Sequence, residues 1–358
     1  MCDCTRLCCL LVDSCRGRDL SVFREEQGKG RKRMRIIIPM AGLGTRLRPH
    51  THTKPKSLLQ VAGRTVLDHV LDQLAALDIE EVVFIIGHLG EQVREYVATH
   101  YHFPTRYVEQ KELKGQAHAL YLAKEYLLGN VFIVFVDTIF EADLSYLERV
   151  SSDGVVFVKE VSDPRRFGVV TVEEGYITGF VEKPETPVSN LAIVGLYYIR
   201  NSALLLQCIE AVLSGGIKTK GEYYLADALQ LMVDRGAKLQ TGTVEVWADC
   251  GKPETLLAAN RYLLDKWGGP QGESINSVII PPVHIAPSAS IEDSIIGPYV
   301  SVADGARVTR SIVSDAIIDE GAHLNNAIVE QSLVGDRAEI RGRPRRVDLG
   351  DDSTLDLG

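Results

Sequence analysis

Short apolar stretches alternate with segments of helical periodicity along the first part of the chain. Four mostly apolar stretches predict strands, at 35–39, 81–86, 105–108 and 131–136. Between them, apolar residues recur every three or four positions, which predicts helices at 65–77, 89–101 and 116–127. Strands that alternate with helices at this spacing predict a parallel, doubly wound α/β sheet. Ligands of such sheets bind at the carboxyl ends of the strands.

From residue 154 onward the pattern becomes richer in strands. Strands are predicted at 155–159, 168–172, 177–182 and 193–199, with one more near 239–247. Further helices are predicted at 203–213, 224–235 and 253–267. The glycines and proline of 268–272 then predict a linker.

Beyond this linker the sequence repeats with a period of 16 or 17 residues. Equivalent apolar positions form three series: Ile296, Val313 and Val329; Val302, Ile318 and Val334; Val308, Leu324 and Ile340. Apolar residues also recur about every six positions within each unit, as one coil of a β-helix with three short faces requires. An antiparallel β domain would explain alternation but not a fixed period. Residues 277–343 are therefore predicted to form a β-helix.

Composition narrows the functional classes. The chain has 358 residues with a net charge of −9, which gives no basic field to attract nucleic acid. No apolar run reaches the roughly 20 residues that span a bilayer, so no membrane partner is expected. Five of the seven cysteines fall within the first 15 residues, at spacings that fit no recognised zinc site. We therefore expect a reducing, cytoplasmic location, and a disordered or spurious extension at 1–33.

A glycine-containing turn follows the first predicted strand directly. Consecutive backbone N–H groups in the turn from Ala41 to Thr45 could hold phosphate oxygens. Leu47 stands where a dinucleotide-binding fingerprint needs glycine, and no Walker motif occurs. Four cations follow within one short loop, as binding of a triphosphate would favour: Arg46, Arg48, Lys54 and Lys56.

Asp137 directly follows the predicted strand 131–136, where a strand end presents a ligand. Carboxylates suit magnesium, which keeps several waters. Taken alone, Asp137 would fit a helix cap or a turn equally well. Asp249 taken alone gives no stronger indication of a metal site.

These segments together resemble the sugar nucleotidyltransferase family, and within it the long-type glucose-1-phosphate thymidylyltransferases. The matching motifs run in family order through 42–51, 55–59, 136–137, 166–170, 181–184, 195–197, 221–227 and 247–254. The resemblance implies a Rossmann-like three-layer domain with a mixed, mostly parallel sheet at 34–268. A short left-handed β-helix of hexapeptide repeats would follow at 277–343, and a tail at 344–358.

The family also implies a reaction and a role for each matched residue. A nucleoside triphosphate and a sugar 1-phosphate would give a nucleotide sugar and pyrophosphate, with Mg²⁺ held by Asp137 and Asp249. Catalytic contacts to phosphates would come from Arg46, Lys56 and Lys183. The nucleotide would meet Ala41, Gly42, Gly44, Thr45, Gln110 and Gly115. The sugar would meet Gly168, Glu182, Gly195 and Tyr197.

The resemblance leaves the substrates open. We expect dTTP and glucose 1-phosphate first, with UTP-glucose, GTP-mannose and ATP-glucose enzymes as alternatives. Thr138 and Cys250 depart from the usual thymidylyltransferase residues. A catalytically silent regulatory subunit is a further alternative, although none of the matched catalytic side chains is missing. The β-helix is expected to make a homo-oligomer rather than a second active site.

Overall fold

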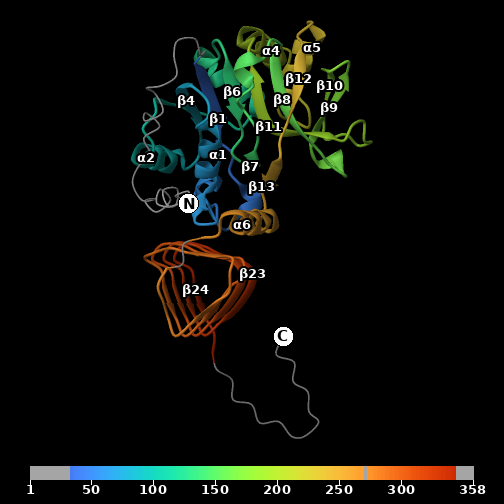
Figure 1. The fold of residues 1–358 in the computed structure, drawn as a ribbon. Helices are drawn as coiled ribbons and strands as arrows, with labels where there is room; N and C mark the ends of the chain where they lie inside the picture. Colours follow the sequence, from blue (N-terminus) through green and yellow to red (C-terminus); the bar gives the residue numbers. More distant parts are fainter. Residues whose placement is uncertain (1–32, 270–271, 344–358) are drawn as a thin grey trace, which may run out of the picture. The chain divides into compact units, whose positions relative to one another are not determined.

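The computed structural model describes residues 33–269 and 272–343, and it contains two compact units (Figure 1). The first unit runs to Leu59 and from Thr65 to Lys252; the second takes Gln60–Arg64 and continues from Pro253. The predictions for the first 32 residues and for 344–358 lie outside the described residues. No helix in the described part of the chain is both long and apolar enough to cross a membrane.

The first unit is built on a nine-stranded mixed sheet. Its strands follow the order β10-β9-β11-β6-β1-β4-β5, and β8 pairs with both β11 and β12. Parallel pairs join β1 to β4 and β6, β4 to β5, and β8 to β12, whereas β11 runs antiparallel to its neighbours. The strands are β1 (Met34–Pro39), β4 (Ile79–Ile86), β5 (Thr105–Glu109), β6 (Val131–Val134), β8 (Gly154–Glu160), β9 (Gly168–Glu173), β10 (Tyr176–Glu182), β11 (Leu191–Ile199) and β12 (Leu239–Thr243).

Helices cover both faces of this sheet, which makes three layers (Figure 1). On one face, α1 (Val66–Leu74) and α2 (Gly90–His100) bury apolar side chains against the strands. The other face is covered by α3 (Gln116–Leu122), α4 (Ser202–Ser214) and α5 (Leu225–Asp234). The predicted α/β class is confirmed.

Three elements differ from the sequence-based expectation. The helix expected over 116–127 ends at Leu122, and Lys124–Tyr126 continues as a separate 3-10 turn. The strand expected over 131–136 ends at Val134, although the Phe135 N–H still donates to the Gly195 oxygen of β11, and the chain then enters β7 (Thr138–Glu141). Two strands replace the single strand expected at 239–247. The first, β12, pairs with β8, and the second, β13 (Val246–Asp249), pairs with β7.

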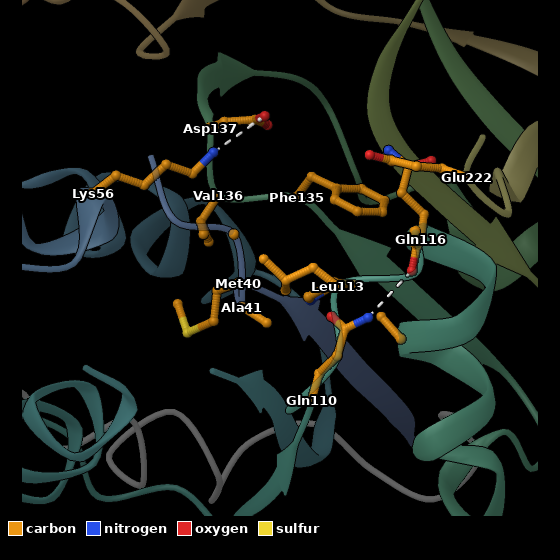
Figure 2. A pocket seen from close by; sticks show the side chains of 14 residues that line it. Met40, Ala41, Lys56, Gln110, Leu113, Gln116, Phe135, Val136, Asp137 and Glu222 are labelled. Atoms are coloured by element: carbon orange, nitrogen blue, oxygen red, sulfur yellow. Dashed lines mark hydrogen bonds and ion pairs between the residues drawn. The ribbon is translucent and has the colours of Figure 1, made fainter. Parts of the chain in front are cut away.

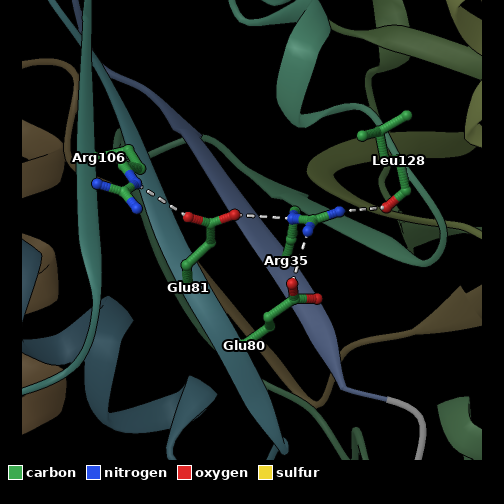
Figure 3. Close-up of polar contacts among 5 residues, drawn as sticks. All are labelled: Arg35, Glu80, Glu81, Arg106 and Leu128. Carbon is green, nitrogen blue, oxygen red and sulfur yellow. Dashed lines mark hydrogen bonds and ion pairs between the residues drawn. The ribbon is translucent and has the colours of Figure 1, made fainter.

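Ion pairs hold the amino ends of β1, β4 and β5 together (Figure 3). The guanidinium of Arg35 contacts the carboxylates of Glu80 at 2.6 Å and Glu81 at 2.8 Å. Arg106 on β5 reaches the second oxygen of Glu81 at 3.3 Å. Since the strands begin here, their carboxyl ends lie at the opposite edge of the sheet, where the glycine turn begins.

The second unit contains the predicted β-helix. All three predicted series are confirmed as ladders: Val313 pairs with Ile296 and Val329, Ile318 with Val302 and Val334, and Leu324 with Val308 and Ile340. These side chains form one apolar core inside the coils. The strands are β14 (Ser274–Ile275), β15 (Val278–Ile279), β16 (Val283–Ile285), β17 (Ser290–Glu292), β18 (Ile295–Ile296), β19 (Val300–Val302), β20 (Arg307–Thr309), β21 (Ile312–Ile318), β22 (His323–Asn325), β23 (Ile328–Val334) and β24 (Glu339–Arg341).

A buried asparagine joins α6 (Pro253–Trp267) to the β-helix within this unit. The side chain of Asn260 is completely buried. Its Oδ1 accepts hydrogen bonds from the Ser301 hydroxyl at 2.7 Å and from the Ala62 N–H at 2.9 Å. Its Nδ2 donates to the Tyr299 oxygen at 3.2 Å. The short hairpin of β2 (Gln60–Val61) and β3 (Arg64–Thr65) is therefore held by this amide.

Candidate active site

The glycine turn after β1 folds back onto the loop that carries Lys56. Gly44 has a φ of +62°, and a Cβ there would lie 3.1 Å from Thr51 Cγ2 and 3.3 Å from Lys56 Cβ. The Thr51 hydroxyl donates to the Gly44 oxygen at 2.9 Å, which closes the turn. A Cβ at Gly42, by contrast, would meet nothing within 4 Å. The backbone at Gly42 can therefore be approached closely by a ligand.

A cavity of about 260 Å³ opens beside this turn (Figure 2). Six of the predicted site residues line it: Ala41, Gly42, Lys56, Gln110, Gly115 and Asp137. Sequence reasoning missed several other lining residues, including Met40, Leu113, Gln116, Phe135 and Glu222. Nine of the predicted residues do not line the cavity itself: Gly44, Thr45, Arg46, Gly168, Glu182, Lys183, Gly195, Tyr197 and Asp249.

Lys56 and Asp137 form an ion pair at one end of the cavity (Figure 2). Lys56 Nζ lies 3.3 Å from Asp137 Oδ2, and the Asp137 side chain is still 42% exposed. The Lys56 ammonium, with a smaller effect from Arg46, holds the pKa of Asp137 below its ordinary value. Asp137 is therefore charged at neutral pH and accessible from the cavity.

Antiparallel pairing of β13 with β7 brings Asp249 beside Asp137, and Arg46 of the glycine turn also lies there. Asp249 at the end of β13 pairs with Thr138, and the Cys250 N–H donates to the Asp137 oxygen at 2.8 Å. A Cβ at Gly251 would lie 2.7 Å from Arg46 Nη2 and 2.8 Å from Asp249 Oδ1. The absence of a side chain at Gly251 thus leaves room for Arg46 beside the carboxylate.

The two carboxylates suit a hard divalent cation. The described residues contain no group of three or more His, Cys, Asp or Glu side chains that could enclose a metal ion. Magnesium in phosphate-transfer sites needs only one or two carboxylates, because substrate phosphates and waters complete its octahedron. Asp137 is exposed toward the cavity, and Asp249 uses one oxygen to accept the Gly251 N–H at 2.8 Å. This donor set fits a cation that is shared with a bound triphosphate.

Gln110 lies at the opposite end of the cavity (Figure 2), and Gly115 also lines the cavity. Gln110 is 5% exposed, and its Nε2 donates to the Gly115 oxygen at 3.3 Å. Gly115 has a φ of +110°, and a Cβ there would lie 2.5 Å from the Tyr223 oxygen. Tyr223 accepts the Ala117 N–H and donates to the Lys114 oxygen, both at 2.9 Å. Close backbone packing therefore fixes the loop that follows β5.

Glu182 and Lys183 form a second polar group near β9. Glu182 pairs with Gly168 across the β9–β10 ladder, and a Cβ at Gly168 would lie 2.8 Å from Glu182 Oε2. Lys183 Nζ lies 3.2 Å from Glu182 Oε1 and 5.5 Å from the centre of the Tyr224 ring. Partial burial lowers the pKa of Lys183, but the Glu182 carboxylate outweighs it, so the net shift is upward. Lys183 is thus a cation held in a defined position.

Two aromatic rings meet at the wall of the cavity. Phe135, which lines the cavity, meets Tyr197 edge to face, with ring centroids 6.2 Å apart. Burial, with smaller effects from Glu182 and Asp137, raises the pKa of Tyr197. Gly195 has a φ of +94°, and its oxygen accepts the Phe135 N–H at 3.0 Å. Phe135 lies two residues before Asp137, at the end of a strand. This position in the sequence is the signal that could have identified it as a site residue.

Comparison with known proteins agrees with this geometry. Residues 35–266 match the family model described as nucleotidyl transferase, and 262–346 match the GlmU-like, C-terminal hexapeptide model. A glucose-1-phosphate thymidylyltransferase from Streptomyces antibioticus is 31% identical, over 90% of this chain and 99% of its own length. A UTP–glucose-1-phosphate uridylyltransferase from Haloferax volcanii is 34% identical, over 65% of this chain and 98% of its own length.

A solved structure also matches the chain. A crystal structure described as a glucose-1-phosphate thymidylyltransferase from Bacillus anthracis has a TM-score of 0.55 and 27% identity, over 64% of this chain and 94% of its own. The sheet, the glycine turn and the order of the motifs therefore agree with the family matches over most of the chain. This protein belongs to the sugar-1-phosphate nucleotidyltransferases and carries a C-terminal left-handed β-helix of hexapeptide repeats.

Proposed function

We propose that the protein transfers the thymidylyl group of dTTP to glucose 1-phosphate, which gives dTDP-glucose and pyrophosphate. The observation that carries this proposal is a single cavity with the charged pair Lys56 and Asp137 at one end and the amide of Gln110 at the other (Figure 2). The likeness to a thymidylyltransferase over 99% of that relative's length supports this choice of substrates.

The reaction needs charge neutralisation more than a strong base. An oxygen of the sugar phosphate attacks the α-phosphorus, a new P–O bond forms, and the bond to the β-phosphate oxygen breaks as pyrophosphate leaves. Both reactants are anions, so Lys56 would contact the phosphates around the reacting centre and Arg46 the departing pyrophosphate. Lys183 would hold the phosphate of the sugar. We propose Mg²⁺ as the cation of Asp137 and Asp249; when bound, it neutralises phosphate charge.

The amide of Gln110 favours a base that presents a ring N–H. Its Nε2 already donates to Gly115, so its Oε1 can accept a hydrogen bond from a ligand in the cavity. Thymine and uracil present the N3–H and guanine the N1–H, whereas the ring nitrogen N1 of adenine is an acceptor. Adenine offers this oxygen its exocyclic N6–H instead of a ring N–H, so the base would have to lie in a shifted position in the cavity.

Glu182 and Tyr197 would face the sugar. A carboxylate accepts hydrogen bonds from sugar hydroxyls, and Lys183 fixes Glu182 for this role.

The hydroxyl of Thr138 donates to the Ala248 oxygen at 3.3 Å, so it stabilises β13. Cys208 and Cys250 are buried thiols, which fits the cytoplasmic location that we propose from cysteine usage.

A product assay tests the proposal. The purified protein is incubated with Mg²⁺, one of dTTP, UTP, GTP or ATP, and a panel of sugar 1-phosphates, and nucleotide sugars are separated by chromatography. We expect dTDP-glucose to form with the highest kcat/KM, UDP-glucose to form more slowly and ADP-glucose to be the weakest product. Preference for UTP would replace the thymidylyl assignment. Absence of every nucleotide sugar, with no pyrophosphate above a chelator control, would instead favour the catalytically silent alternative.

A further inference from the structure

The orientation of the Gln110 amide decides which bases the cavity can accept. The two ends of an amide are a donor nitrogen and an acceptor oxygen of similar size, so a half-turn exchanges them with little change of shape. With the oxygen toward the cavity, the amide accepts from a base that presents a ring N–H. With the nitrogen there, it would instead donate to a ring nitrogen that carries a lone pair. The neighbours of the amide therefore select the class of base.

Two neighbours contact the amide nitrogen. Gln110 Nε2 donates to the Gly115 oxygen at 3.3 Å and lies 3.3 Å from His118 Nδ1 in α3. A backbone carbonyl only accepts, so the nitrogen is the end of the amide that faces Gly115. His118 Nδ1 must then accept as well, which makes the ring neutral with its proton on Nε2. Figure 2 shows the amide oxygen on the side of the group away from the bond to Gly115.

His118 is the neighbour whose hydrogen-bonding role can change. The Gly115 oxygen also accepts the Ala119 N–H at 3.1 Å, so it keeps a hydrogen bond when the amide turns away. A protonated His118 ring would present an N–H to the amide, and only the amide oxygen can accept it. Because a charge-assisted hydrogen bond is roughly twice as strong as a neutral one, the charged ring favours the reversed amide.

The surroundings of His118 favour the neutral ring. Burial lowers the pKa of His118, the Lys114 ammonium lowers it further, and the Glu112 carboxylate opposes them. Among the residues that the structure describes, α4, α5 and β1 pack against α3 but bring no charge that shifts this pKa. The ring is therefore neutral at pH 7, and it gains a proton only as the pH falls below the ordinary histidine value of about 6.5.

We propose that His118 is a positioning residue that sets the base preference of this enzyme: the neutral ring keeps the Gln110 oxygen toward the base, and the protonated ring reverses the amide. His118 does not line the cavity, so it acts through Gln110. This inference rests on the proposed nucleotidyl transfer at this cavity. It adds that bases with a ring N–H, such as thymine and uracil, are selected only while His118 is neutral.

Two nucleotides of the same shape test the proposal. Thymine presents the N3–H where 5-methylcytosine presents a lone pair, and the two bases otherwise differ only at the group on C4. With saturating glucose 1-phosphate and Mg²⁺, kcat/KM is measured for dTTP and for 5-methyl-dCTP from pH 5.5 to pH 8.5. Both nucleotides carry the same triphosphate, so titration of the phosphates and of the groups that bind them cancels in the ratio. UTP and CTP form the same matched pair if the product assay selects UTP.

We expect the wild-type ratio to favour dTTP about 10- to 100-fold at pH 8, the effect of an unsatisfied amide oxygen. The ratio should fall at least about fivefold by pH 5.5, as the amide reverses. His118→Asn places a side-chain oxygen near the position of Nδ1 but takes up no proton. It should keep the wild-type ratio at pH 8 and lose the dependence on pH.

Two further variants separate the role of His118 from a structural one. His118→Leu leaves the amide with the single bond to Gly115, so the ratio at pH 8 should fall about threefold to tenfold. His102→Asn, at an exposed histidine outside the cavity lining, is the matched control and should behave as the wild type at every pH. Melting temperatures establish that each variant folds.

The failure of this inference differs from the failure of the proposed function. A wild-type ratio that does not change with pH, or an equal fall in His118→Asn, would overturn the role of His118. Equal ratios for the wild type and His118→Leu at pH 8 would overturn it as well. Absence of any nucleotide sugar from either base would instead refute nucleotidyl transfer itself.

Discussion

At the scale of single residues, Lys56 and Arg46 both act on the charge of Asp137. Lys56 lowers the pKa of Asp137, and Arg46 adds to this effect from beside Gly251. The carboxylate therefore stays ionised at the pH where the phosphates of a substrate are also charged. Repulsion between carboxylate and phosphate is the reason that we propose a divalent cation between them.

Loss of either carboxylate should nearly stop turnover. Asp137→Asn and Asp249→Asn keep the shape of the side chain but remove charge from the proposed magnesium site. We expect kcat to fall by roughly two to three orders of magnitude, since metal stabilisation of the transition state contributes several kcal/mol. The measurement is pyrophosphate release under saturating substrates. Asp143→Asn, at an exposed carboxylate, is the control, and wild-type turnover in either site variant would refute the magnesium assignment.

Gly115 should tolerate no side chain. Alanine there would combine a strained φ of +110° with a Cβ 2.5 Å from the Tyr223 oxygen, and it would displace the Gln110 amide. We expect kcat/KM for dTTP to fall about 10- to 100-fold, the cost of a displacement near 1 Å. Gly236→Ala is a matched control, because its φ is +88° and a Cβ there meets nothing within 4 Å. Equal effects of the two substitutions would show that backbone strain alone is responsible.

At the scale of elements, apolar pattern predicted the sheet and the coils but not the strand pair β7 and β13. The three inward series of the β-helix could be read because a fixed period repeats each position three times. By contrast, Thr138–Glu141 is a short strand that pairs only with Val246–Asp249, more than 100 residues later. No local pattern reports such a distant partner. Asp137 and Asp249 were named from motifs, whereas the pairing that brings them together was not predicted.

The start of α1 offers a test of stability against pH. Asp68 accepts hydrogen bonds from Tyr101 at 2.6 Å, Tyr96 at 2.7 Å and the Thr65 N–H at 3.0 Å. Burial raises the pKa of Asp68, but these bonds outweigh it and the net shift is downward. The pKa of an aspartate in the unfolded chain is about 3.9. The stabilisation from these hydrogen bonds is therefore fully present above that pH, and it is lost as the pH falls through the lower pKa of Asp68 in the folded protein.

Asp68→Asn should therefore destabilise the protein in a pH-dependent manner. We expect a loss of about 1–3 kcal/mol at pH 7, because a charged acceptor of two hydroxyl groups is removed. The difference from the wild type should shrink as the pH falls below about 3.9. Urea unfolding at several pH values measures it, with Glu95→Gln on the exposed side of α2 as the control. A difference that stays constant down to pH 3 would contradict the depressed pKa.

At the scale of the whole molecule, the second unit begins earlier than the linker at 268–272 suggests. Pro253–Trp267 and the hairpin of 60–64 belong to the same compact unit as the β-helix. A truncation after Trp267 would remove Tyr299 and Ser301, the partners of the buried Asn260. Loss of an oligomer in such a truncation could follow from unfolding of α6.

The cysteine-rich segment at 1–33 is expected to have no part in the reaction. The described residues that line the cavity begin at Pro39, and β1 begins at Met34. A chain that starts at Met34 should keep kcat and KM within about twofold of the full-length values, because it loses no residue of the proposed site. Steady-state kinetics of the two proteins side by side measures this. A large loss of activity would give the segment a function in catalysis or folding.

The fate of two labels on dTTP tests the proposed chemistry most directly. The protein is incubated with glucose 1-phosphate, Mg²⁺ and dTTP that carries ³²P at either the α- or the γ-phosphate. Attack at the α-phosphorus predicts that the α-label appears in dTDP-glucose and the γ-label in pyrophosphate, in equal amounts. Asp137→Asn should suppress both products together. Release of the γ-label as orthophosphate, or of the α-label as dTMP without dTDP-glucose, would contradict nucleotidyl transfer at this site.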